Sequence, residues 1–466
     1  MKKRIVKIFA MVFALLLLCG MISGCNSNQP NEEGKVQIRV GNWPTDASPV
    51  ELQQREETKA RFEAENPDIE IVPDTYTFST DTFLVKASAN QLPDMYCVPF
   101  TEIQKIIGQG FAQDITGVLE ELEWKQYLNP EVATLVTDAS NAIYAVPGEL
   151  YAQGLAINKE IFKQAGLVND DGTVQIPETL DEMAEFATII KEKTGKAGFA
   201  LPTTDNCGGW HFLNIAWDFG TEFMVKNDDG TYRATFDSAE TQNALQYVKD
   251  LKWEYNALPE NAVIDNAELR KIFATNQAGM IFLAPSSFSE LVSQYGMPID
   301  NIAVASMPEG PMGRYSQTGG NVWMFSKNCT PESVKAGLKW MEFLGMGPTI
   351  SDTQLQTLEE TYKTNRDEGR LVLGRDVFNT WENQETIEKK TQVASKYCNV
   401  DMKDYEHYFA FEGVQLKPEE PMCCQELYAV LDKCIQEVIT NKNADVVSLI
   451  QEANNDFQVN HLDKAQ

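Results

Sequence analysis

The chain contains little histidine and lacks paired cysteine motifs, which excludes most kinds of metal site. It has 3 His and 9 Cys among its 466 residues. The His residues lie far apart, at positions 211, 407 and 461. No C-x₂-C pair is followed by a second pair of ligands at the spacing that a zinc site needs. We therefore expect neither a metal ion nor another cofactor.

Signature motifs of several enzyme classes are also absent. The sequence has no G-x-S-x-G elbow, no H-E-x-x-H, no G-x-x-x-x-G-K-[ST] and no G-x-G-x-x-G. Two Asn-Asp-Asp-Gly segments, at 169–172 and 227–230, lack an acidic ligand that a calcium-binding loop requires, and are typical of turns. These absences favour a protein that is not an enzyme.

Basic residues are scarce relative to acidic ones. The chain has 39 Lys and Arg against 68 Asp and Glu, a net charge of −29. A nucleic-acid partner needs a basic surface, so this balance argues against one. A hydrophobic content of 43% with 10% aromatics is typical of a folded protein. The length exceeds one typical domain and suggests two lobes.

Long apolar runs are confined to the N-terminus, where residues 8–18 are too short a run to span a bilayer stably. Four basic residues precede the run, and Ile-Ser-Gly-Cys follows at 22–25, which describes an export signal. The four residues at 22–25 resemble the lipobox of bacterial lipoproteins. That resemblance implies a signal peptide at 1–24 and a diacylated Cys25, with residues 25–35 as a lipid-anchored, flexible tether on the extracytoplasmic face of the cell membrane. An ordinary secretory signal with an incidental Cys is the alternative.

Strand and helix patterns alternate along the rest of the chain. Strands are expected at 36–40, 69–72, 93–98, 142–147, 155–157, 199–201, 280–283 and 302–306, with residues 148–154 between two of them. Helices are expected at 48–65, 83–89, 103–110, 159–166, 180–194, 208–220, 239–255, 266–275, 332–344, 427–441 and 446–457. This alternation predicts an α/β protein with mainly parallel sheets flanked by helices.

Four stretches carry a resemblance to a known family. They are Arg-Phe-Glu-Ala-Glu-Asn-Pro-Asp-Ile-Glu at 61–70, Leu-Pro-Asp-Met-Tyr at 92–96, Ile-Tyr-Ala-Val-Pro at 143–147 with its continuation at 154–167, and Gly-Gly-Asn-Val-Trp-Met-Phe-Ser at 319–326. In this order and spacing they resemble the extracellular solute-binding proteins of ABC importers (family 1), the class that serves sugars and oligosaccharides.

The resemblance implies a two-lobed, type II periplasmic-binding-protein-like fold with a ligand cleft at the hinge. Lobe one would comprise residues 36–148 and 307–348, and lobe two residues 149–306 and 349–466. A monomer of this class would capture a carbohydrate by lobe closure and deliver it to ABC permease subunits. A secreted glycoside hydrolase, or a sensor or adhesin with the same fold but no role in transport, are the alternatives.

Sugars present apolar C–H faces and hydroxyl edges, so aromatic rings, carboxylates and amides near strand ends are candidate contacts. The candidate ligand-binding residues are Asn42, Trp43, Asp81, Phe100, Thr101, Glu149, Tyr151, Trp210, Ser286, Asn321 and Trp323. Competing roles exist for some of them: Trp43 and Trp210 can be core residues, and Asp81 can cap a helix.

Overall fold

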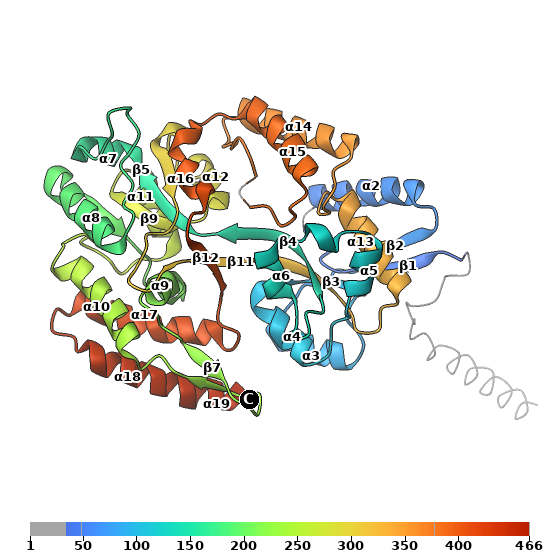
Figure 1. Ribbon diagram of the computed structural model, residues 1–466, viewed down its shortest axis with the longest axis horizontal. Coiled ribbons are helices and arrows are strands. Elements are labelled where there is room, and N and C mark those ends of the chain that lie inside the picture. Colours follow the sequence, from blue (N-terminus) through green and yellow to red (C-terminus); the bar gives the residue numbers. More distant parts are fainter. Residues whose placement is uncertain (1–33, 48, 377, 466) are drawn as a thin grey trace, which may run out of the picture.

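The computed structural model describes residues 34–47, 49–376 and 378–465, which form two lobes joined by long strands (Figure 1). Cys25, the expected signal peptide and most of the expected tether lie outside the described residues. Across the described ranges, no helix has both the length and the apolar character needed to cross a bilayer.

Lobe one is built around parallel strands whose alternate residues are buried. In β1, Ile38 and Val40 point into the core, and β2 and β3 pair with this strand on either side. Its elements are β1 (Val36–Val40), α2 (Pro49–Glu65), β2 (Ile69–Pro73), α3 (Thr80–Ser88), β3 (Met95–Pro99), η1 (Phe100–Glu102), α4 (Ile103–Gly108), α5 (Thr116–Glu121), η2 (Lys125–Tyr127), α6 (Pro130–Val136) and α13 (Pro331–Phe343).

Two strands run from one lobe to the other, β4 (Ala145–Ala152) and β11 (Arg314–Phe325), and β12 (Val414–Pro418) joins their sheet from lobe two. The first half of β11 pairs in parallel with β12, and its second half pairs antiparallel with β3 of lobe one. β4 runs antiparallel to most of β11, from Thr318 opposite Ala152 to Met324 opposite Ala145. In the described residues this gives one six-stranded sheet, with the order β12-β11-β3-β1-β2 and β4 added on β11.

Lobe two contains a second sheet with the order β10-β5-β9-β6. Its strands are apolar throughout because both faces are covered: Leu155 and Ile157 enter one core, while Ala156 enters another on the opposite face. Its elements are β5 (Gly154–Asn158), α7 (Lys159–Ala165), α8 (Leu180–Thr194), β6 (Ala197–Ala200), α9 (Cys207–Asp218), β7 (Met224–Lys226), β8 (Tyr232–Ala234), α10 (Ala239–Trp253), α11 (Asn266–Ala274), β9 (Ala278–Leu283), η3 (Pro285–Ser287), α12 (Phe288–Ser293), η4 (Ile299–Asn301), β10 (Ile302–Ala305), η5 (Met402–Asp404), α16 (Glu406–Ala410), α17 (Cys424–Thr440), α18 (Val446–Phe457), η6 (Gln458–Leu462) and α19 (Asp463–Ala465).

Two further helices, α14 (Asp352–Asp367) and α15 (Gln384–Tyr397), bridge the lobes at the top of Figure 1. Leu373, between them, packs in the smaller core of lobe two. Trp381 packs in the core of lobe one, where its indole N–H donates to the Met346 carbonyl (2.9 Å) and its ring meets Trp124 edge-on. This second contact is not expected from the assignment of residues 349–466 to lobe two.

The predicted α/β architecture is confirmed, with mixed sheets. In the sheet of lobe one the pairs β1–β2, β1–β3 and β11–β12 are parallel, as expected, whereas antiparallel pairs are more frequent in the sheet of lobe two. The sheet of lobe two has two antiparallel pairs and one parallel pair, and β11 runs antiparallel to both β3 and β4. Residues 148–154 were expected to separate two strands, yet most of them continue β4. β4 continues through these residues because it pairs with β11, which returns between the lobes in the opposite direction.

The last residue of α9, Asp218, anchors the start of β11. Its carboxylate accepts a hydrogen bond from the Tyr315 N–H (2.7 Å), and its carbonyl accepts one from the Met312 N–H (2.9 Å). The other carboxylate oxygen is buried without a hydrogen-bond partner among the described atoms. Burial raises the pKa of Asp218 well above its usual value, although the Tyr315 N–H and the nearby Arg314 oppose the shift.

We expect Asp218→Asn to make the free energy of unfolding less dependent on pH. The folded chain keeps the Asp218 proton while the unfolded chain releases it near pH 3.8. Stability is therefore lost as the pH rises above that value, with a limiting slope of about 1.4 kcal/mol per pH unit, until the raised folded pKa is passed. Asn keeps an acceptor for Tyr315 and does not ionise. Urea unfolding from about pH 4 to 8 measures both slopes, and identical slopes would contradict this prediction.

Candidate ligand-binding site between the lobes

A cavity of about 730 Å³ lies between the two lobes on the side of α4 and the β7–β8 hairpin. Lobe one contributes η1, α4 and the end of α6. Lobe two contributes the β7–β8 hairpin and the segment that follows β12. These elements approach each other at the bottom of Figure 1, below the crossing strands. A cavity of this size between two lobes is typical of a small-molecule binding site.

Trp210 and Glu419 meet at the edge of this cavity. Trp210 lies in the first turn of α9 and is half-buried, and its indole N–H donates to a Glu419 carboxylate oxygen (2.7 Å). Glu419 follows β12 and lines the cavity. The preceding residue, Gly209, lets α17 approach closely, since an added Cβ would lie 2.5 Å from the Tyr428 Cα. Close packing of α9 on α17 therefore fixes the place of Trp210.

Tyr151 reaches the same group from β4. Its ring is half-buried, and its hydroxyl lies against Gly319 of β11, where a Cβ would not fit. Burial, and to a smaller extent the charge of Glu419, raise the pKa of Tyr151 to about 12. The phenol is therefore neutral at physiological pH and can donate a hydrogen bond. Tyr151, Trp210 and Glu419 thus come together from three separate segments.

Buried amides support this group from behind. The Gln317 N–H donates to the Asn214 side-chain oxygen (2.8 Å), and the Asn214 amide donates to Gln153 (3.4 Å). When the Gln317 side-chain amide is turned so that both its oxygen and its nitrogen form hydrogen bonds, its oxygen also accepts from the Trp210 indole N–H (2.8 Å). Gln153, Asn214 and Gln317 are almost fully buried, so this network links the β4–β5 junction, α9 and β11 without any charge.

Other predicted site residues lie in or near the cavity. Phe100 and Thr101 in η1 line it, as expected from their place after β3. Glu149 and Asn321 are cross-strand partners on β4 and β11. Asn321 is exposed, whereas the side chain of Glu149 lies outside the described part of the structure. Trp323 is half-buried on β11 and packs against the core of lobe one.

The remaining candidates are not brought to the cavity. Trp43 is only 5% exposed, stacks on Trp340 and donates to Glu56 (2.8 Å), so it serves as a core residue of lobe one. Asn42 is exposed in a left-handed conformation with φ +55°, and Ser286 is exposed in η3 after β9. Neither lines the cavity. Asp81 lies in the first turn of α3, but its side chain is outside the described set.

Sequence reasoning missed Glu419 and the β7–β8 hairpin. Only the turn of this hairpin, at 227–230, was predicted, and it connects β7 to β8. The apolar alternation of Val414 and Leu416 before Pro418 was a signal for β12. It is short, however, and its pairing with β11 joins segments about a hundred residues apart.

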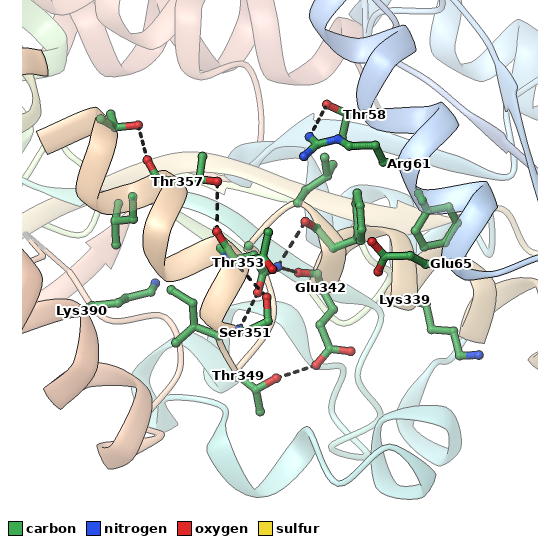
Figure 2. Close-up of a pocket in the computed structure, with 18 of the residues that line it drawn as sticks. Thr58, Arg61, Glu65, Lys339, Glu342, Thr349, Ser351, Thr353, Thr357 and Lys390 are labelled. Carbon is green, nitrogen blue, oxygen red and sulfur yellow. Dashed lines mark hydrogen bonds between the residues drawn. The ribbon is translucent and has the colours of Figure 1, made fainter.

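A larger hollow, about 840 Å³, lies on the outer side of lobe one against α14 (Figure 2). Figure 2 shows Arg61 of α2 facing Ser351 and Thr357 of α14 across it. Several of its polar groups are already paired, such as Thr349 with Glu342 (2.6 Å). It has no contribution from the lobe-two elements that face α4. The cavity between the lobes, which both lobes line, is therefore the candidate ligand site.

Solved structures share this architecture at low sequence identity. The sugar-binding protein MalE from Xanthomonas citri superposes with a TM-score of 0.65 at 16% identity, covering 90% of this chain and 95% of that one. The cyclic α-maltosyl-1,6-maltose binding protein from Arthrobacter globiformis gives 0.61 at 18%, covering 91% and 98%. UgpB from Mycobacterium tuberculosis, in complex with glycerophosphocholine, gives 0.61 at 14%, covering 93% and 99%.

These likenesses and the two lobes around a central cleft define a type II periplasmic-binding-protein fold. The model of the bacterial extracellular solute-binding protein family matches residues 47–345, and the chain belongs to that family. Its family and structural neighbours are binding proteins rather than enzymes. A melibiose/raffinose/stachyose-binding protein, MelE of Bacillus subtilis (strain 168), is 26% identical over 188 residues, and this match spans 40% of each protein.

We expect Asn214→Ala to lower the free energy of unfolding by about 1–3 kcal/mol, because the Gln317 backbone N–H and the Gln153 side-chain oxygen both lose the Asn214 side chain as a buried partner. Urea unfolding at neutral pH measures the loss. Asn243 on α10 is exposed, and Asn243→Ala serves as the control, with an expected change within about 0.5 kcal/mol. Equal stability of the two variants would show that the network adds nothing to the fold.

Proposed function

We propose that this protein is a lipid-anchored, extracytoplasmic receptor that binds a carbohydrate between its lobes and delivers it to an ABC permease. The observation that carries the proposal is the convergence of Trp210, Tyr151 and Glu419 at the inter-lobe cavity. Aromatic rings offer faces for the C–H side of a sugar, and a carboxylate accepts hydrogen bonds from its hydroxyls. Family membership and the binding-protein neighbours support the same function.

The arrangement suits capture by closure. Phe100 and Thr101 belong to lobe one, whereas Tyr232 and Glu419 belong to lobe two, and all four line the cavity, so one ligand there can touch both lobes. A ligand with contacts on both lobes stabilises the closed form by its differential affinity for that form. The closed form would then dock on the permease subunits as a monomer. Energy for transport would come from an ATPase outside this chain.

Hydrolysis of the bound sugar is the less favoured alternative. A glycoside hydrolase needs two carboxyl groups flanking the scissile bond. Among the described residues that line the cavity, the acids are Glu419 and Asp138. The Asp138 carboxylate already accepts hydrogen bonds from the N–H groups of Ser140 and Ala142 and from Tyr144. Binding without turnover fits these residues better, and transport in cells would separate an importer from a sensor or adhesin.

The names of related proteins support a carbohydrate ligand. MelE is a melibiose/raffinose/stachyose-binding protein, and two of the structural neighbours are by name a sugar-binding protein and a cyclic α-maltosyl-1,6-maltose binding protein. UgpB was solved with glycerophosphocholine, so a glycerophosphodiester belongs in any ligand screen.

We expect the melting temperature of the purified protein to rise with one class of saccharide in a thermal-shift screen that also includes glycerophosphocholine, amino acids, polyamines and metal ions. A ligand at 100 times its Kd stabilises by about 2.7 kcal/mol. The saccharide should be recovered intact. A rise with a non-sugar ligand alone, or recovery of a cleaved glycan, would contradict the proposal.

The matched variants are Trp210→Ala and Trp253→Ala. Trp210→Ala should weaken saccharide binding at least tenfold, because a central aromatic contact is worth about 2 kcal/mol or more. Trp253 is a half-buried tryptophan of the same lobe whose indole N–H donates to the Val438 carbonyl (2.7 Å), away from the cavity. Trp253→Ala should keep the affinity of the unchanged protein. Equal weakening by both variants would remove Trp210 from the site.

We expect Cys25→Ser to release the protein from the membrane fraction of the cells that produce it. The diacyl anchor inferred from the sequence attaches to the Cys25 thiol, which serine lacks. Fractionation followed by immunoblotting measures the distribution, and mass spectrometry of the N-terminus measures acylation. Cys19→Ser, at the residue directly after the apolar run, is the control and should leave the protein membrane-bound. An unchanged distribution for Cys25→Ser would contradict lipid anchoring at this residue.

A further inference from the structure

The two walls of the inter-lobe cavity differ in chemistry. The wall from lobe two is formed largely by carbon surface, with Tyr232, Pro418, Pro421 and Met422. The wall from lobe one is polar and is formed by hydrogen-bonding side chains, which include Thr101, Gln104, Lys105 and Gln109. A pyranose ring has one apolar face and a rim of hydroxyls, and it matches a slot with one wall of each kind.

The charges around the cavity balance. Among the described lining residues, Lys105 and Lys226 are basic, and Asp138 and Glu419 are acidic. Lys105 is paired with Glu102 (3.3 Å). A balanced lining gives no net attraction for an anionic ligand such as a phosphodiester or for a cationic polyamine. The cavity therefore favours an uncharged ligand, although the whole chain carries −29.

Tyr232 is held in place before any ligand binds. It pairs with Lys226 across the β7–β8 hairpin, and the Lys226 ammonium lies 6.0 Å from the centre of its ring. The turn is closed by the Asn227 N–H, which donates to the Thr231 carbonyl (2.7 Å). β8 is tied to the C-terminal helices, because the Ala234 N–H donates to Gln458 (2.8 Å). A fixed aromatic ring costs little conformational entropy when a ligand packs on it.

The opposite wall is also fixed. The Gln104 amide donates to the carbonyls of Leu135 (3.2 Å) and Thr137 (3.0 Å), and thereby joins α4 to the end of α6. Glu419 connects this part of the cavity to the Trp210 group, since it lines the cavity and accepts from the Trp210 indole. A ligand unit held at Trp210 and Tyr151 can therefore continue past Glu419 towards Tyr232.

From this placement we propose that the space between the β7–β8 hairpin and α4 is a distal subsite, with Tyr232 as its platform, which selects uncharged oligosaccharides longer than a disaccharide. The proposal rests on the proposed sugar-binding function and deepens it. The volume of 730 Å³ lies in the upper part of the range of ~300–1,000 Å³ that holds drug-sized ligands, which is more than one hexose ring fills. Lobe closure would bring the polar wall onto the hydroxyl rim of the outer units.

Calorimetric titration with two saccharide series of increasing length tests the proposal. The probes are melibiose, raffinose and stachyose, together with maltose, maltotriose and maltotetraose. In the series that binds, the trisaccharide and tetrasaccharide should bind at least about tenfold more tightly than the disaccharide. Tyr232→Ala should reduce this advantage to about threefold or less. Tyr232→Phe keeps the ring and should keep the advantage.

Tyr255→Ala is the matched control, because Tyr255 is a partly buried tyrosine of lobe two that does not line the cavity. It should leave the length preference unchanged. The distal subsite is overturned if Tyr232→Ala weakens all lengths by the same factor, or if the unchanged protein binds the disaccharide as tightly as the longer sugars. Either result leaves the sugar receptor intact, whereas an unchanged protein that binds no saccharide overturns the receptor and the subsite together.

Discussion

The antiparallel pairing of β4 with β11 is the contact on which the rest of the structure depends. β4 carries the chain out of lobe one, and β11 carries it back, with Thr318 opposite Ala152 and Met324 opposite Ala145. β12 pairs with the first half of β11, and Glu419 follows β12 directly. The position of β11 therefore also determines where Glu419 lies. Tyr151 sits on β4 itself. A shift of one residue in this register would turn these side chains to the other face of the sheet.

The buried side-chain network behind the cleft is polar but uncharged, and this suits a region that must hold two lobes in register. Charges are costly to bury, whereas paired amides satisfy each other. Gln153, Asn214 and Gln317 form such a network. Burial lowers the pKa of His211 to about 3, so its imidazole is neutral at physiological pH, and burial raises the pKa of Asp218 well above its usual value. Glu419 is the carboxylate that lines the cavity beside Tyr151 and Trp210.

The sequence predicted the repeating elements well and the site in part, and the difference has a physical cause. The ends of helices such as α18 follow from capping residues and from the spacing of apolar residues nearby in the sequence, so these helices could be predicted. Trp43 follows the first strand and Trp210 lies at the start of a helix. Nothing in the neighbouring sequence shows which of the two is a core residue. Trp43 becomes a core residue only because Trp340, from a distant helix, stacks on it. Glu419 was not predicted for the same reason, because its position depends on the pairing of β12 with β11, which is distant in the sequence.

The lobes are also connected on the side away from the cavity. Figure 1 places α14 and α15 above the crossing strands, and α4 and β7 below them. Leu373 is packed in lobe two and Trp381 in lobe one, and the latter is fixed by the Met346 carbonyl and the Trp124 ring. A rotation about the crossing strands that narrows the cleft at α4 must widen the gap spanned by α14 and α15. If a ligand closes the lobes as proposed, the free energy that it gains by touching both walls of the cavity would be opposed by the strain or loss of these apolar contacts, and the balance between the two would set how tightly it is held.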